Sequence, residues 1–119
     1  MYKADLGSVV DIWKVNTFSY DMGGNRGRQH FVLYGSASEA DPGWDVADLK
    51  LFMPIVEVDT SRMQISEYTG TCIMKKTGLL GSSRWLIWAV IPVTSNAGGE
   101  NTAFQEFQVN LFLKDQMVR

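Results

Sequence analysis

Polar and apolar positions along this chain alternate, in most segments, with the two-residue period of a β-strand. The clearest segment, residues 84–94, reads RWLIWAVIPVT. Both of its faces are apolar if it is extended, which is typical of a central strand covered from both sides. We therefore expect this segment to lie in the middle of a sheet, with a sheet, a helix or a neighbouring subunit over each face.

Several other segments carry strand patterns and are separated by turn signals. Residues 17–22 alternate aromatic and polar positions, as expected of a half-buried strand. The glycine-rich residues 23–29 follow, and a strand pattern resumes in residues 30–37, so these two strands are predicted to form a hairpin. Further strand patterns occupy residues 8–15, 53–58, 63–68 and 71–76.

Residues 42–52 break the strand pattern and predict a short helix. Asp41 can act as its N-cap, and Pro42 suits the first helical position. Val46, Leu49 and Phe52 would then share one helical face. We expect this helix to cover one end or edge of the sheet.

Residues 103–114 are compatible with two structures. As a strand, Phe107, Val109 and Leu111 would face inward, whereas as a helix Phe104 and Phe107 would join Leu111 in an apolar stripe. The regular alternation of VNLFLK favours the strand.

Together these patterns predict a single all-β domain that spans residues 1–119, in keeping with the length of the chain. Seven or eight antiparallel strands with one short helix indicate a β-sandwich or a jelly-roll-like fold, and a small closed β-barrel is the alternative. The start of the chain has no basic and apolar leader, and the longest apolar run is much shorter than the roughly 20 residues of a membrane helix. We therefore expect no membrane partner.

The inventory of chemically reactive residues is short. The chain has one cysteine and one histidine, too few for a disulfide, a zinc cluster or a two-histidine metal site. Cys72 lies in the apolar run TCIM and is expected to be a reduced, buried thiol. No nucleophile elbow or phosphate-binding P-loop occurs. These observations predict a protein that is not an enzyme and that holds no cofactor or metal.

Trp44 lies in the turn DPGWD, among several carboxylates. We expect its indole to anchor the loop to its own core or to a neighbouring subunit, and the stacking of a sugar ring is the alternative role. The acidic residues of this region are expected to be a helix cap and a solvated surface, rather than a calcium or glycosidase site. They are Glu39, Asp41, Asp45 and Asp48.

The loop GGNRGRQH is the candidate for recognising an anion or a protein partner. Arg26 and Arg28 would point the same way if the loop is extended, and their guanidinium groups suit carboxylates and phosphates. A single-stranded nucleic acid is an alternative partner for these arginines, together with Lys75 and Lys76 and the stacking rings of Phe18, Tyr20 or Tyr34. The formal net charge of −2 argues against phosphate binding as the main task.

These considerations favour a structural role. The aromatic residues, the six methionines and the two-sided apolar strands exceed what a lone domain of 13.3 kDa readily hides. We predict a non-enzymatic assembly subunit that contacts other protein subunits, such as a decoration, capsid or tail component of a virus or phage particle. Its expected location is the virion, with the cytoplasm as the alternative. Arg26, Arg28 and Trp44 are the predicted partner-binding residues, with the loop of residues 95–101 as a further contact.

Two other functions remain open at this point. One is a single-stranded nucleic-acid-binding β domain that uses the basic residues named above. The other is a carbohydrate-binding module centred on Trp44.

Overall fold

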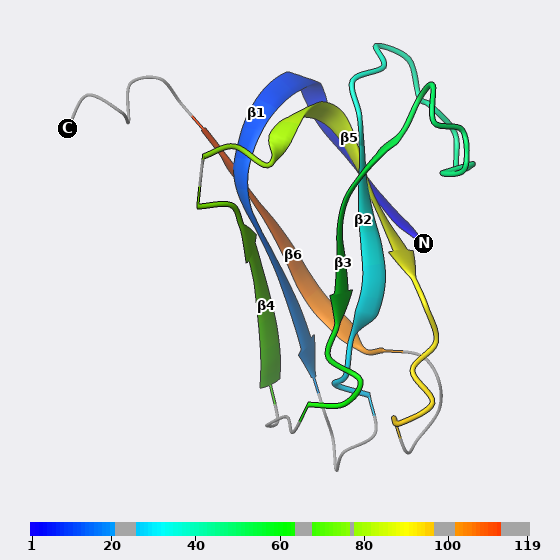
Figure 1. Cartoon of the computed structure of the whole chain (residues 1–119), viewed down its shortest axis with the longest axis vertical. Coiled ribbons are helices and arrows are strands. Elements are labelled where there is room, and N and C mark those ends of the chain that lie inside the picture. The colour runs from blue at the N-terminus through cyan, green and yellow to red at the C-terminus, as the bar shows by residue number, and fades with distance from the viewer. Residues whose placement is uncertain (21–25, 64–67, 77, 97–101, 113–119) are drawn as a thin grey trace, which may run out of the picture.

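The described residues form one curled antiparallel sheet. The computed structural model describes residues 1–20, 26–63, 68–76, 78–96 and 102–112. The sheet is shaped as a half-barrel (Figure 1) with the strand order β3-β2-β5-β1-β4, and β6 also pairs with β1. The strands are β1 (Tyr2–Tyr20), β2 (His30–Ser36), β3 (Met53–Asp59), β4 (Tyr68–Met74), β5 (Gly81–Val90) and β6 (Phe104–Leu111).

The all-β prediction is confirmed, but its details change. Residues 8–15 and 17–22 were expected to form two strands, and the described part of both belongs to the 19-residue strand β1. The described residues therefore hold six strands, not seven or eight, and these make one sheet instead of two stacked sheets. The outermost strands β3 and β4 do not pair within the described residues, so the alternative of a closed barrel is not seen there.

Strand β1 connects two parts of the sheet, because its two halves pair with different strands. Its first half pairs with β5, and its second half lies between β4 and β6. The register with β5 shifts around Gly7, whose φ of 86° is one that residues with a side chain rarely adopt. The register with β6 shifts again between Ile12 and Lys14. Such bulges increase strand twist and bending, which accounts for the curl of the sheet.

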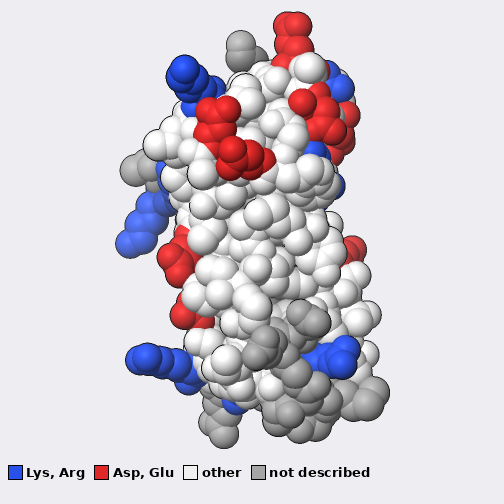
Figure 2. Space-filling view, turned by 90° about the vertical axis from the view of Figure 1, so that its right-hand side faces the viewer, with Lys and Arg blue, Asp and Glu red and all other residues white. Residues whose placement is uncertain are grey.

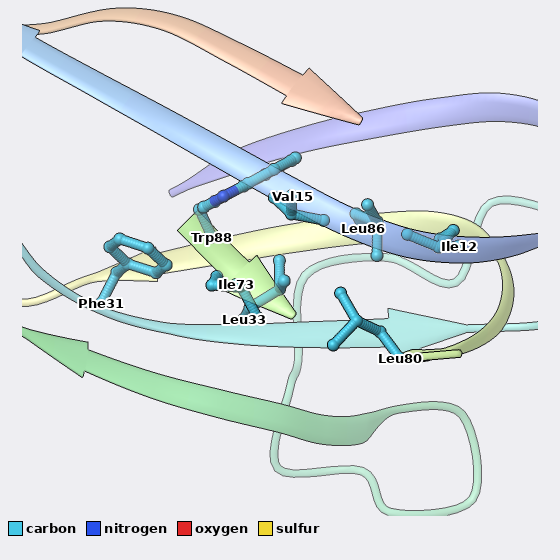
Figure 3. Packing of buried hydrophobic residues seen from close by; sticks show 8 residues of the cluster. All are labelled: Ile12, Val15, Phe31, Leu33, Ile73, Leu80, Leu86 and Trp88. Carbon is cyan, nitrogen blue, oxygen red and sulfur yellow. The ribbon is translucent and has the colours of Figure 1, made fainter. Parts of the chain in front are cut away.

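The prediction of a central buried strand is confirmed by β5. This strand lies between β1 and β2, and four consecutive residues from Trp85 to Trp88 are all buried. The strand ends at Val90, before the end of the predicted segment. The core cluster on the inner face of the curl (Figure 3) contains Ile12, Val15, Phe31, Leu33, Ile73, Leu80, Leu86 and Trp88.

The predicted helix at residues 42–52 is wrong. The segment is a loop of turns between β2 and β3, in which the carboxylates of Asp41, Asp45 and Asp48 each accept a hydrogen bond from the backbone N–H two residues later. Aspartate side chains that bond locally in this way compete with helical hydrogen bonds. The supposed apolar face also divides, since Phe52 is buried whereas Leu49 is 76% exposed.

The strand interpretation of residues 103–114 is confirmed by β6, and Leu113 and Lys114 lie outside the described residues. A register shift opposite Phe18 and Ser19 leaves Gln105 as an extra residue. The shift allows Phe104 and Phe107 to pack on the same core although they are three positions apart.

The predicted hairpin of residues 17–37 is also wrong. β1 and β2 are not neighbours, because β5 lies between them. The chain therefore crosses from one part of the curl to another after Tyr20. Residues 21–25, which were expected to form the tip of that hairpin, lie outside the described residues.

Candidate interaction surfaces

The second half of β1 turns its polar side chains inward. Thr17 and Ser19 are fully buried, whereas Phe18 and Tyr20 are partly exposed. The alternation of polar and apolar residues does not by itself show which face of a strand is buried. Hydrophobicity alone would predict that the face with Phe18 and Tyr20 is buried. The reason for the reversal is a buried amide, that of Gln29, which meets the polar face from within the curl.

Gln29 is fully buried and binds both β1 and β4. Its Oε1 accepts hydrogen bonds from the hydroxyls of Thr17 at 3.0 Å and Thr71 at 3.3 Å. Its Nε2 donates to Ser19 Oγ at 2.9 Å and to the carbonyl oxygen of Thr69 at 3.3 Å. A buried amide that is satisfied in this way fixes the geometry of the strands around it. The network therefore directs the aromatic side chains of β1 to the outer surface.

An exposed apolar surface results on the outside of β4 and β1. We call it the β4 face and define it by Tyr68, Cys72 and Met74 of β4 with Phe18 and Tyr20 of β1. Tyr68 is 67% exposed and Met74 is 55% exposed. The tyrosine rings lie 5.0 Å apart, and in the register Phe18 is opposite Gly70. A Cβ atom at Gly70 would lie 3.0 Å from the Phe18 ring, so the glycine lets this ring lie against the strand.

Cys72 corrects the prediction of a buried thiol, because it is exposed on the β4 face. Its inward-facing neighbours, Thr71 and Ile73, occupy the buried side of β4 instead. The apolar run TCIM therefore does not indicate burial at every position. As the single cysteine of the chain, Cys72 is a natural probe of this surface.

Among the described residues, three strands pair on one side only, and these edge strands differ in how they are protected. Edge strands expose unpaired backbone groups, and proteins block them with charges, prolines and bulges. β3 carries Pro54, Glu57 and Asp59 and has a register shift, and β6 carries Glu106 and the shift at Gln105. β4 has no charge and no proline, and its seven residues pair with β1 without a shift. The uncharged sequence YTGTCIM is the signal of this edge in the chain.

Arg28 makes hydrogen bonds within the protein, and its predicted partner-binding role stays a prediction. Its guanidinium donates hydrogen bonds to the carbonyl oxygens of Met63 and Ser95, each at 3.2 Å. Its backbone is held as well, since Asn96 Oδ1 accepts from its N–H and Thr102 Oγ1 donates to its carbonyl oxygen. Arg28 therefore joins the loops at one end of the sheet.

The other predicted contacts are distributed over the molecule. Arg26 is exposed beside Arg28, before β2 begins, whereas Trp44 lies in the loop after β2 ends (Figure 1). The fold thus separates the arginines from Trp44 by the length of β2. Most of the third predicted contact, residues 97–101, lies outside the described residues.

Trp44 packs against a lysine, as a loop anchor would. Lys3 Nζ lies 4.1 Å from the centre of the Trp44 ring and 2.6 Å from Asp41 Oδ1. The side chain of Lys3 is only 8% exposed, whereas Trp44 as a whole is 51% exposed. Close by in the sheet, Arg84 binds Asp5 at 2.9 Å and the carbonyl oxygen of Glu39. Acidic side chains are prominent at this upper end of the molecule (Figure 2).

These ion pairs predict a weakening of the loop in acid. The ammonium of Lys3 holds the pKa of Asp41 below its ordinary value, and the guanidinium of Arg84 does the same for the pKa of Asp5. A lowered pKa stabilises the fold above the carboxyl's unfolded pKa of about 4, and this contribution is lost as the pH falls through the folded-state pKa. In Lys3→Met, we expect the free energy of unfolding to fall less steeply below pH ~4.

This prediction can be checked by urea unfolding at a series of pH values. Lys50→Met is the matched control, because Lys50 lies in the same loop and makes no salt bridge within the described residues. Its pH dependence should match that of the unmodified chain. If the unfolding free energy of Lys3→Met had the same pH dependence as that of the unmodified chain, the ion pair of Lys3 with Asp41 would not contribute to stability.

Two findings about other classes of site concern the described residues only. No group of three or more histidine, cysteine, aspartate or glutamate side chains is placed there to hold a metal ion. No described helix is long and apolar enough to cross a membrane.

Comparisons with models of protein families, with curated proteins and with solved structures found no match for this chain. The functional argument therefore depends on the fold and its side chains.

Proposed function

We propose that this chain is a non-enzymatic assembly subunit that contacts a second copy of itself through β4. The observation that carries the proposal is the difference between the edge strands: β3 and β6 are blocked by charges, bulges or proline, and β4 is not. An unblocked, uncharged edge is a template for pairing with another strand. A twofold axis beside β4 would pair the strand with its own copy, as in an isologous interface.

The side chains of the β4 face support the same proposal. Strand pairing by itself supplies backbone hydrogen bonds, and apolar side chains beside the seam supply buried area. Tyrosine, phenylalanine and methionine are enriched in protein interfaces, and Tyr68, Phe18 and Met74 occupy this surface. Because the strand has no charged residue, the contact should persist in high salt.

The first test is the mass of the purified chain in solution, measured by light scattering on a sizing column at physiological and high salt. We expect an oligomer at both salt concentrations. In parallel, a maleimide should label Cys72 slowly in the oligomer and faster on dilution, because the partner would cover the thiol. A monomer with a rapidly labelled Cys72 at every concentration would contradict self-assembly through β4.

The substitution Met74→Glu should dissociate the oligomer. A carboxylate buried at the seam would lose its hydration, and this desolvation costs several kcal/mol even beside a cation, or roughly a hundredfold or more in the dissociation constant. The fold should tolerate the change, because Met74 is opposite Lys14 in the register and is followed by Lys75. The dissociation constant can be measured by sedimentation equilibrium.

Met53→Glu is the matched control for this substitution. Met53 is a methionine of similar exposure, 60%, on the edge strand β3. The Met53→Glu substitution should leave the oligomer intact. If both variants dissociate equally, the contact does not involve β4 specifically.

The narrower form of the proposal is a subunit of a virus or phage particle. A repeated shell or tail requires small rigid units with an edge or face that joins copies, and the exposed β4 edge meets that requirement. The virion location and the cytoplasmic alternative stay predictions. The carbohydrate-binding alternative also stays a prediction, with Lys3 placed against the Trp44 ring that a sugar would use.

A further inference from the structure

A second surface combines aromatic walls with lysines. A pocket of about 330 Å³ lies beside the connection from β4 to β5. Trp13 of β1 and Phe112, which follows β6, provide its aromatic lining, and Lys75, Lys76 and Gly78 of the connection complete it. The volume is near the lower end of the usual range for small-molecule sites.

The fold holds this lining in place from three separate parts of the chain. The N–H of Phe112 donates a hydrogen bond to the carbonyl oxygen of Asp11 at 2.8 Å, which fixes the end of β6 beside β1. The N–H of Gly78 donates to the carbonyl oxygen of Lys75 at 3.3 Å and closes the connection into a tight turn. Gly78 has a φ of 127°, which a residue with a side chain would adopt only with strain.

Positive charge gathers around Trp13. Lys14 Nζ lies 4.7 Å from the centre of the indole ring, and Lys75 and Lys76 line the same pocket. Within the described residues, none of these three lysines makes a salt bridge. By contrast, Lys3 and Arg84 are each paired with an aspartate. In a chain of net charge −2, two lysines that line one pocket and a third against its indole, none of them in a salt bridge with a described residue, favour an anionic ligand.

We propose that this pocket binds a nucleotide, with the base against Trp13 and Phe112 and the phosphate at Lys75 and Lys76. Bases stack on aromatic side chains, and ammonium groups bind phosphate oxygens by charge-assisted hydrogen bonds. The described lining has no carboxylate, histidine or cysteine side chain, which are the usual metal ligands. The nucleotide is either free or part of a single-stranded nucleic acid, and the two share this chemistry. The proposal does not depend on assembly through β4.

This site differs from the nucleic-acid surface predicted from sequence. That prediction joined Lys75 and Lys76 to Arg26 and Arg28, but the guanidinium of Arg28 donates to the carbonyl oxygens of Met63, after β3, and Ser95, after β5. The rings beside the two lysines are instead Trp13 and Phe112, which are 99 positions apart and meet because β6 pairs with β1. Neither ring is adjacent to a basic loop in the sequence.

The test is a titration of the full chain at low salt, followed by tryptophan fluorescence. The probes are adenosine monophosphate and a short oligothymidylate. Stacking on Trp13 should quench the fluorescence, and Trp13→Phe should remove most of the quenching. In the double variant Lys75→Gln and Lys76→Gln, binding should weaken roughly ten- to a hundredfold, as expected when charged hydrogen bonds are lost. Both lysines are exposed, so the variant should fold normally.

Lys50→Gln is the control for charge alone, and it should bind both probes as the unmodified chain does. Quenching by the oligonucleotide alone would identify nucleic acid as the source of the nucleotide, and quenching by the monophosphate alone would identify a free nucleotide. The proposal is overturned if neither probe quenches at millimolar concentration, or if the double lysine variant binds like Lys50→Gln.

Discussion

Replacing Gln29 with leucine should destabilise the fold by about 3 kcal/mol or more, because several buried polar groups would lose a partner, each at a cost of about 1–3 kcal/mol. The carbonyl oxygens of Thr17 and Thr69 would lose the donor Nε2, and the hydroxyl of Thr71 would lose Oε1. Such a loss is a large fraction of the roughly 5–15 kcal/mol that stabilises a typical domain. The free energy of unfolding in urea measures the effect.

Gln108→Leu is the matched control for this substitution. Gln108 is exposed on β6, where its amide hydrogen-bonds to the side chains of Asn16 and Glu106. Its replacement should change the free energy of unfolding by no more than about 0.5 kcal/mol, as is usual for surface substitutions. Equal stability of the two variants would mean that the buried amide does not hold β1 and β4 together.

A double-mutant cycle with Thr71→Val separates the network from simple packing. Valine has nearly the shape of threonine but cannot donate to Gln29 Oε1. If the two side chains act as one network, Thr71→Val should cost less in the Gln29→Leu chain than in the unmodified chain. Additive effects would argue that each group contributes by itself.

The sequence was most informative where one property dominated a whole segment. Strand β5 could be predicted because its residues are apolar on both faces, and such a segment is stable only when both faces are covered. Strand β6 could be predicted from its alternation, even though the extra residue Gln105 breaks the pattern at one end. Neither prediction required knowledge of a partner strand.

The predictions failed where a local hydrogen bond or a bulge decided the structure. The helix at residues 42–52 had a suitable cap and apolar spacing, but three aspartate side chains bond to the backbone of the loop instead. The inward face of β1 depends on Gln29, which is twelve residues from Thr17. Hydrophobicity patterns do not contain this information, because they rank a buried glutamine as a surface residue.

The candidate sites were harder to predict than the fold. Arginine is a residue type that often binds anionic ligands, yet the guanidinium of Arg28 donates hydrogen bonds to carbonyl oxygens of loops distant in the sequence. The only sign of the β4 edge in the sequence is that the strand has no charged residue. This sign can be interpreted only when the strand is known to lie at the end of the sheet. The strand order decides which segments lie at the edges of the sheet, and the hydrophobicity pattern does not predict that order.

Replacing Trp88 with alanine should destabilise the fold by about 3–5 kcal/mol, the usual cost of removing a large buried aromatic side chain. Trp88 is 1% exposed, and its ring lies 4.6 Å from that of Phe107, so it joins β5 to β6 across the inside of the curl. Its Nε1 is buried without a hydrogen-bond partner in the described part of the chain. Trp88→Phe should therefore cost less than its lost volume suggests, because it also removes an unsatisfied donor.

Trp44→Ala is the control in the same urea experiment. Trp44 is half-exposed and rests mainly on Lys3, an interaction worth about 0.5–1 kcal/mol at an exposed site. The expected order of destabilisation is thus Trp88→Ala first, then Trp88→Phe, with Trp44→Ala smallest. If Trp88→Ala were no more destabilising than Trp44→Ala, the two halves of β1 would not enclose a common core. The curl of the sheet, and with it the outward orientation of the β4 face, would lose its physical basis.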